Sequence, residues 1–207
     1  MEHRSTAGPR RCALLAPVLL LLAALLLAGC GSASADGSVP PGTVLDLGES
    51  AVVAAPDPSA ASTTTPVLVE LAVTGVRERP RTDIAALEIA AQEPDLVPYF
   101  VTVDLAGVDP SSARLAGTPL LGDVHALARG GEPSRDYLAN VDVEPGPDGG
   151  FWPCDSTVPE DFDEGSTVQV CVFFLAPSGT EITEVHYMAA GTDYADRPVV
   201  WKLDTAR

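Results

Sequence analysis

The chain has 207 residues, of which 46% are hydrophobic, and its 29 acidic and 12 basic residues give a formal net charge of −17. This apolar content excludes a wholly disordered chain, and the length suits one domain or two small ones. No nucleic-acid partner is expected, because neutralising phosphates requires a basic surface that this composition does not provide. Composition alone therefore limits the class of protein without defining an activity.

Residues 1–29 have the three zones of a secretory signal peptide. Arg4, Arg10 and Arg11 make a positive start, and an apolar run follows at residues 13–28. This run is short for a bilayer span, which needs about 20 residues. We therefore expect the leader to be cleaved, the alternative being an uncleaved anchor or a buried core helix. The pair Arg10-Arg11 leaves twin-arginine export open beside the general route.

The leader ends in Leu27-Ala28-Gly29-Cys30, which resembles the lipobox of bacterial lipoproteins. The resemblance implies cleavage before Cys30 and a thioether-linked diacylglycerol on it, so Cys30 is the expected lipidation site. Two or more acyl chains hold a protein durably on a membrane. Because an acidic surface is repelled by anionic headgroups, the lipid would make the membrane contact. The expected location is the extracytoplasmic side of the cell membrane; the alternative is a soluble exported protein.

Small and polar residues follow the cysteine, so residues 30–41 are expected to form the lipidated cysteine and a flexible tether. Residues 42–207 are then expected to form one domain. A second stretch rich in Ala, Pro, Ser and Thr, residues 54–66, is expected to be a long loop or an extension of the tether.

Apolar residues alternate with mixed ones in several segments of the remaining chain, which is the pattern of half-buried antiparallel strands. These segments are residues 67–74, 99–105, 137–143, 167–174, 184–187 and 199–202. Turn residues such as Gly130-Gly131 separate them. The predicted fold is all-β, an antiparallel sandwich of two sheets.

One short helix is predicted after Thr82 or Asp83 as its capping residue. Ile84, Leu87 and Ala91 would share one face of it. Such a helix would pack over an end of the sandwich.

Cys154 and Cys171 remain once the leader and the lipidated cysteine are set aside, and they predict a disulfide in an oxidising compartment. A metal site with His186 or His125 is the alternative, although the thiols lack zinc-ligand spacing. Cys171 falls out of phase with its apolar neighbours. The bridge should therefore tie the loop of residues 155–165 to the outer face or rim of a sheet.

No catalytic motif occurs in the sequence, and no catalytic residue, enzymatic activity or bound cofactor is expected. A hydrolase would need His125, oriented by Asp123, to activate Ser134 or Ser178. Their spacing gives no support to this arrangement.

The acidic loop supplies the alternative function, a calcium-binding module, because several close carboxylates suit a hard cation. Its metal candidates are Asp155, Asp161, Asp163 and Glu164, although their order does not match an EF-hand. A solvated loop explains the same residues in an acidic protein.

Aromatic residues near turns are candidate binding anchors. They are Phe151, Trp152 and Tyr194, of which Trp152 is expected to pack near the disulfide, whereas Trp201 is expected in the core.

Several short motifs in order resemble a family of immunoglobulin-like (telokin-like) secreted antigens and lipoproteins of actinobacteria. They are Pro98-Tyr99-Phe100-Val101, Trp152-Pro153-Cys154, Phe162-x-x-Gly165, Cys171, Val185-x-Tyr187 and Pro198-Val199-x-Trp201. The sequence departs from the family at Asp104-Leu105-Ala106-Gly107, where an asparagine in a short turn is expected, which leaves strand pairing there open. The resemblance implies an immunoglobulin-like sandwich without catalytic residues.

The sequence therefore predicts a non-enzymatic, lipid-anchored surface domain. Its partners would be the membrane, through the lipid on Cys30, and a protein or other envelope component. We expect a monomer, because strong net charge opposes self-association.

Overall fold

A computed structural model of the chain describes residues 36–58, 66–85, 87–120, 122–129, 139–140 and 154–203. Contacts divide the chain into residues 1–32 and residues 33–207, and all described residues belong to the second unit. The expected lipidation site Cys30 and the expected leader thus lie outside the described residues. So do Ser134, Phe151 and Trp152.

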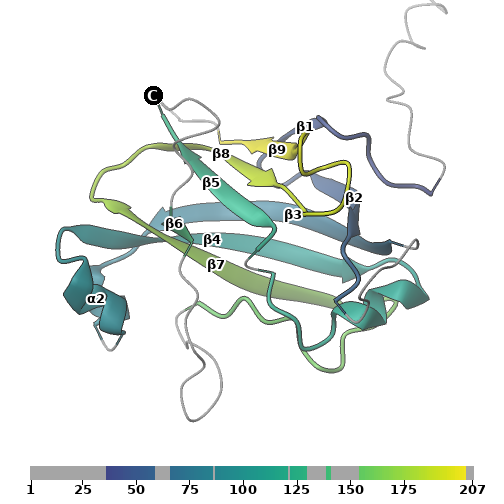
Figure 1. Cartoon of the computed structure of the whole chain (residues 1–207), viewed down its shortest axis with the longest axis horizontal. Coiled ribbons are helices and arrows are strands. Elements are labelled where there is room, and N and C mark those ends of the chain that lie inside the picture. Colours follow the sequence, from purple (N-terminus) through teal and green to yellow (C-terminus); the bar gives the residue numbers. More distant parts are fainter. Residues whose placement is uncertain are drawn as a thin grey trace, which may run out of the picture. The chain divides into compact units, whose positions relative to one another are not determined.

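The second unit is a β-sandwich (Figure 1). One sheet has the order β1 (Val44–Asp46), β9 (Val199–Lys202), β8 (Ile182–Tyr187) and β5 (Val124–Ala128). The other has the order β2 (Ser50–Ala55), β3 (Val67–Glu78), β4 (Leu96–Gly107), β7 (Thr167–Pro177) and β6 (Ala139–Asn140). All neighbours are antiparallel except β1 and β9, which are parallel. The predicted all-β sandwich is confirmed.

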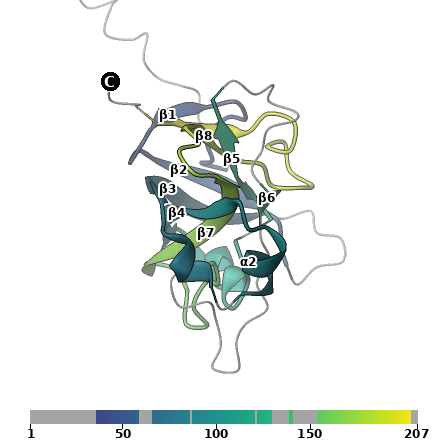
Figure 2. The ribbon, with the colours of Figure 1, turned by 90° about the vertical axis from the view of Figure 1, so that its left-hand side faces the viewer.

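The main core lies between the two layers, which Figure 2 shows in side view. It takes one face of β3, β4 and β7, as the period-two pattern predicted, and Trp201 of β9 is buried in it. The indole Nε1 of Trp201 donates to the carbonyl of Glu49 at 2.8 Å, so its polar atom is satisfied. Burying a large apolar side chain contributes about 1.5–3 kcal/mol, so these facing rows stabilise the packing of one sheet on the other.

Of the strands that the structure describes, β1, β2 and β5 were not predicted. β1 is three residues long, and β2 and β5 are rich in alanine, which has little preference for strands. Their pairing with longer neighbours makes them strands. Of the strand predicted at residues 137–143, the described part is β6.

Strand pairing continues through Asp104 to Gly107, the segment where the family resemblance left it open. β4 pairs there with β3 and, as far as Ala106, with β7. The Gly107 amide donates to the Ser166 carbonyl at 2.9 Å, and the Gly165 amide donates to the Gly107 carbonyl at 2.8 Å. The segment is the regular end of a long strand.

The predicted helix is divided into two shorter pieces, the 3₁₀ helix η2 (Arg81–Ile84) and α2 (Glu88–Gln92). Pro80 precedes η2 in the capping position and makes no side-chain hydrogen bond to the helix. The expected caps, Thr82 and Asp83, lie inside η2. Ile84 is buried as predicted, but Ala91 is exposed and Ala90 is buried instead. The break between the pieces changes the helical phase and explains this exchange.

A second, smaller core lies on the outer face of the five-stranded sheet. Its buried residues are Ile84, Ala90, Phe100, Cys154, Phe173 and Leu175. Both ribbon views place α2 beside β4 and β7 (Figures 1 and 2). The two helical pieces thus cover part of that outer face.

The compact unit begins earlier than the expected boundary at residue 42. Ser38 is buried, and the Val39 amide donates to the Val52 carbonyl at 2.8 Å. The Val39 carbonyl accepts from the Tyr194 hydroxyl at 2.7 Å. At least residues 38 and 39, assigned to the flexible tether, are therefore part of the folded unit.

Within the described ranges, no helix is long and apolar enough to cross a bilayer.

Candidate functional site

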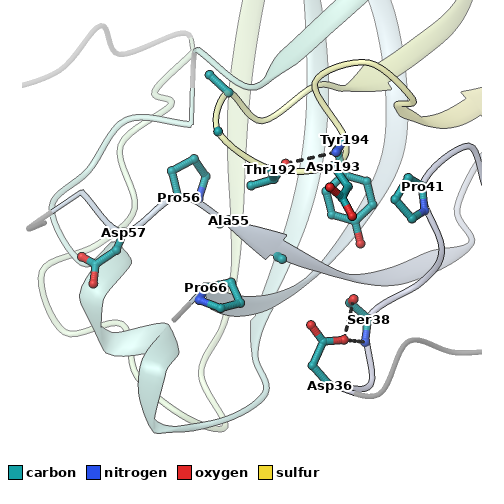
Figure 3. A pocket seen from close by; sticks show the side chains of 13 residues that line it. Asp36, Ser38, Pro41, Ala55, Pro56, Asp57, Pro66, Thr192, Asp193 and Tyr194 are labelled. Carbon is teal, nitrogen blue, oxygen red and sulfur yellow. Dashed lines mark hydrogen bonds between the residues drawn. The ribbon is translucent and has the colours of Figure 1, made fainter. Parts of the chain in front are cut away.

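A pocket of about 620 Å³ lies where the first described residues meet the end of β2 and the loop after β8 (Figure 3). We call it the N-terminal pocket. Its lining residues are Asp36, Ser38, Pro41, Ala54, Ala55, Pro56, Asp57, Pro66, Ala190, Gly191, Thr192, Asp193 and Tyr194. Its volume is in the range of small-molecule sites.

Hydrogen bonds within the chain already hold two of the three carboxylates of this pocket. Asp36 Oδ1 accepts from the Ser38 hydroxyl at 2.7 Å and from the Ser38 amide at 3.0 Å. These bonds to the charged form lower the pKa of Asp36. Asp57 forms an ion pair with Arg114, and its side chain is buried. Asp193 is exposed and lies beside Tyr194, across the pocket from Asp57 (Figure 3).

The aromatic wall of the pocket is Tyr194, which was a candidate for an exposed anchor. It is 2% exposed, and its ring packs edge-on against Tyr187 at 5.7 Å between centroids. Burial raises the pKa of both hydroxyls. The anchor interpretation of Tyr194 was wrong, because the ring fills the end of the sandwich.

The two histidines among the described residues are opposite each other on β5 and β8, and neither lines the N-terminal pocket. His125 and His186 are partners in the strand register. His186 Nε2 lies 2.8 Å from a carboxylate oxygen of Glu184, and His125 Nε2 lies 3.2 Å from the Gly122 carbonyl. Burial lowers the pKa of His125 and raises that of Asp123 to about 6.

Ser178, the described nucleophile candidate, is engaged elsewhere. Its hydroxyl donates to Glu78 at 2.7 Å, in the turn after β7. The proposed arrangement of His125 and Ser178 is not present.

The disulfide joins Cys154 to Cys171 of β7. Both residues belong to the outer cluster, whereas Val170 and Val172 belong to the main core. The bridge therefore lies on the outer face of its sheet, as the strand phase predicted.

The acidic loop that follows the disulfide closes an end of the sandwich. Val158 and Phe162 are buried in the main core, and the Val158 amide donates to the Thr118 carbonyl at 2.9 Å. Val158 and Phe162 thus hold in place a loop whose acidic composition is typical of a solvated loop.

Two of the four metal candidates in this loop accept hydrogen bonds from residues close to them in the sequence. Asp155 Oδ1 accepts from the Thr157 amide at 2.9 Å, and Asp163 Oδ1 accepts from the Ser166 hydroxyl at 2.6 Å. Asp161 and Glu164 are exposed. Among the residues that the structure describes, no group of three or more His, Cys, Asp or Glu side chains could hold a metal.

A second hollow, of about 700 Å³, opens on the outer face of the five-stranded sheet, and we call it the sheet groove. Its lining residues are Thr74, Gly75, Arg77, Arg79, Phe100, Thr102, Cys154, Asp155, Gln169, Val170 and Cys171. It combines two arginines, two hydroxyls, an amide, one carboxylate and the disulfide. It lies on the same sheet face as the small outer core.

The residues of both hollows were missed by sequence reasoning, except the disulfide cysteines, Asp155 and Tyr194. For the sheet groove a signal exists: Arg77 and Arg79 have the spacing that places two side chains on one face of a strand. For the N-terminal pocket we find no such signal, because its walls come from segments distant in sequence.

Comparison with protein-family models, with curated proteins and with solved structures found no match to this chain.

Proposed function

We propose that this chain is a lipid-anchored lipoprotein of the extracytoplasmic face of the cell membrane, with a non-enzymatic β-sandwich that binds an envelope component. The observation that carries the proposal is the Cys154–Cys171 disulfide. Stable structural disulfides belong to oxidising compartments, which lie outside the cytoplasm. The resemblance of residues 27–30 to a lipobox, and of the domain to immunoglobulin-like antigens and lipoproteins of actinobacteria, agrees with that location.

The start of the folded unit supports an anchor close to the domain. Asp36 follows Cys30 by six residues, a length that reaches at most about 20 Å when extended. A lipid on Cys30 would therefore hold the N-terminal pocket within that distance of the membrane surface. The sandwich would face the envelope components nearest the bilayer.

A binding role fits the described polar groups better than catalysis does. Ser178 is bound to Glu78, and Asp57 to Arg114. The His186–Glu184 pair lies on a different sheet from the groove residues. The positions of the described carboxylates give the calcium alternative no comparable support.

The test is replacement of the two N-terminal cysteines, one at a time, in the native host. Cys30→Ser should abolish the acyl mass and release the protein from washed membranes, or leave it unprocessed. Cys12→Ser is the matched control, because it removes a cysteine within the leader and should leave lipidation and retention unchanged.

The measurements are intact mass and membrane fractionation, with formation of the Cys154–Cys171 bridge as the check on folding. The proposal would be wrong if the Cys30→Ser protein kept the native acyl mass, or if it lost its leader and still remained as firmly bound to the membrane as the native protein.

A further inference from the structure

Arg77 is exposed and forms no ion pair with any described carboxylate. Its neighbour Arg79 is held in place: it pairs with Asp83 at 2.9 Å, and its guanidinium lies 5.8 Å from the centroid of the Phe100 ring. The sheet groove thus presents one positioned arginine and one unpaired arginine.

A β-bulge directs Arg77 into the groove. Along β3, Val69, Leu71 and Val73 point into the main core, so strict alternation would also direct residues 75 and 77 inward. The register shifts between Val73 and Gly75, and Arg77 is then paired with Phe100, a residue of the outer cluster. Bulges that re-aim a side chain are common beside binding sites.

The groove surface beside the arginines is polar. Thr74 and Thr102 contribute hydroxyls, Gln169 contributes an amide, and Asp155 contributes a carboxylate that accepts from the Thr157 amide. The Gln169 amide nitrogen donates to Asp104 at 2.7 Å, which fixes the amide and leaves its oxygen as an acceptor. Such a surface matches the hydroxyl groups of a ligand better than it matches an apolar side chain.

We propose that the sheet groove binds an acidic sugar, a hydroxyl-bearing ring that carries a carboxylate or a phosphate. The guanidinium of Arg77, assisted by Arg79, takes the oxyanion in paired N–H···O bonds, and the hydroxyls and amide of the groove contact the ring. The inference names the ligand class of the binding role proposed above, and it does not depend on the lipid anchor.

The test uses the detergent-solubilised full chain and isothermal titration with three probes. Glucuronic acid carries a carboxylate, glucose 6-phosphate carries a phosphate, and glucose carries neither. We expect one or both acidic probes to bind, with affinity falling as salt rises, and glucose not to bind. The acidic probe that binds more tightly identifies the oxyanion.

Variants then locate the site. Arg77→Gln should weaken binding by about tenfold or more, and Arg77→Lys should fall between it and the native protein, because lysine keeps the charge but loses paired bonding. Arg197→Gln is the matched control, since this arginine is also exposed and does not line the groove. It should change affinity less than twofold.

The inference is overturned if the folded protein binds neither acidic probe, if glucose binds equally well, or if Arg77→Gln and Arg197→Gln behave alike. Near-ultraviolet circular dichroism of each variant establishes that it is folded. None of these results alters the retention test on Cys30, so failure of the ligand assignment and failure of the anchored location remain distinguishable.

Discussion

Gly107 is a residue at which the backbone leaves no room for a side chain. A Cβ atom there would lie 1.9 Å from the carbonyl oxygen of Asp163. The close approach brings the end of β4 against the acidic loop, and the hydrogen bond between Gly165 and Gly107 fastens it. The glycine is therefore required by packing and not by a turn.

Gly107→Ala should consequently destabilise the domain by about 1–3 kcal/mol, the usual cost of overpacking. Urea unfolding followed by tryptophan fluorescence measures it. Gly122→Ala is the control, because a Cβ there meets no atom within 4 Å, and its effect should stay within about 0.5 kcal/mol. Equal effects at the two positions would contradict the close contact.

The carboxyl group of Asp123 makes the stability of the fold depend on pH. Burial raises its pKa to about 6, so the folded state retains a proton that the unfolded state has lost between about pH 4 and pH 6. Stability from this group is therefore present at low pH and is lost as the pH rises through 6.

Asp123→Asn should raise the free energy of unfolding at pH 7.5 by about 2 kcal/mol and change it little at pH 4. The amide can keep the hydrogen bond from the Ala190 backbone. Urea unfolding of both proteins at the two pH values tests this. A gain of equal size at both would show that burial of the charge is not the cause.

At the scale of elements, the turn between β7 and β8 is held by a single carboxylate from β3. Glu78 accepts hydrogen bonds from the Ser178 hydroxyl at 2.7 Å, the Gly179 amide at 2.8 Å and the Tyr99 hydroxyl at 2.8 Å. These bonds, led by that from Ser178, lower the pKa of Glu78. Their contribution is thus complete above the ordinary glutamate pKa and is lost as the pH falls through the lowered value.

The amide proton shift of Gly179 should follow this titration, with a midpoint below the ordinary glutamate value of about 4.3. Glu78→Gln should remove the transition. Glu181→Gln, which changes a nearby glutamate paired with Arg129, should leave it in place. A midpoint at or above 4.3 in the native protein would contradict the three-bond clamp.

The disulfide and the acidic loop form another element-scale unit. The bridge fixes one end of the loop on the outer sheet face, while Val158 and Phe162 anchor it in the main core. Because these anchors are independent, loss of the bridge should weaken the fold without abolishing it.

Replacing Cys154 and Cys171 together by alanine should cost about 3 kcal/mol by loop-closure entropy. Urea unfolding of the variant, beside the native protein with and without reductant, measures the cost. Reduced native protein should match the variant. An unfolded variant would mean that the two apolar anchors cannot hold the loop alone.

For the whole molecule, we expect the net charge of −17 to govern association. Like charges should keep copies apart at neutral pH, and protonation of carboxyl groups near pH 4 should remove most of that repulsion. Sedimentation of the detergent-free Cys30→Ser protein should show a monomer at pH 7.5 and association near pH 4. A dimer at pH 7.5 in low salt would contradict a charge-stabilised monomer.

Sequence and structure agree most where a pattern is local. Period two identified the core faces of β3, β4 and β7, and the phase of Cys171 placed the disulfide outside the core. Short β1 and alanine-rich β5 gave no such pattern. These strands pair with strands far along the chain, and the sequence of a single segment does not indicate its distant partner.

The chain's own residues determined its charge, its alternating strands and the pairing of two cysteines, because each depends on composition or on near neighbours. Tertiary structure alone decided that Tyr194 is buried, that Val39 belongs to the folded unit, and that a bulge directs Arg77 outward. Each of these depends on which distant segments meet. A pocket or groove forms where distant segments pack together, so its position depends on the tertiary structure.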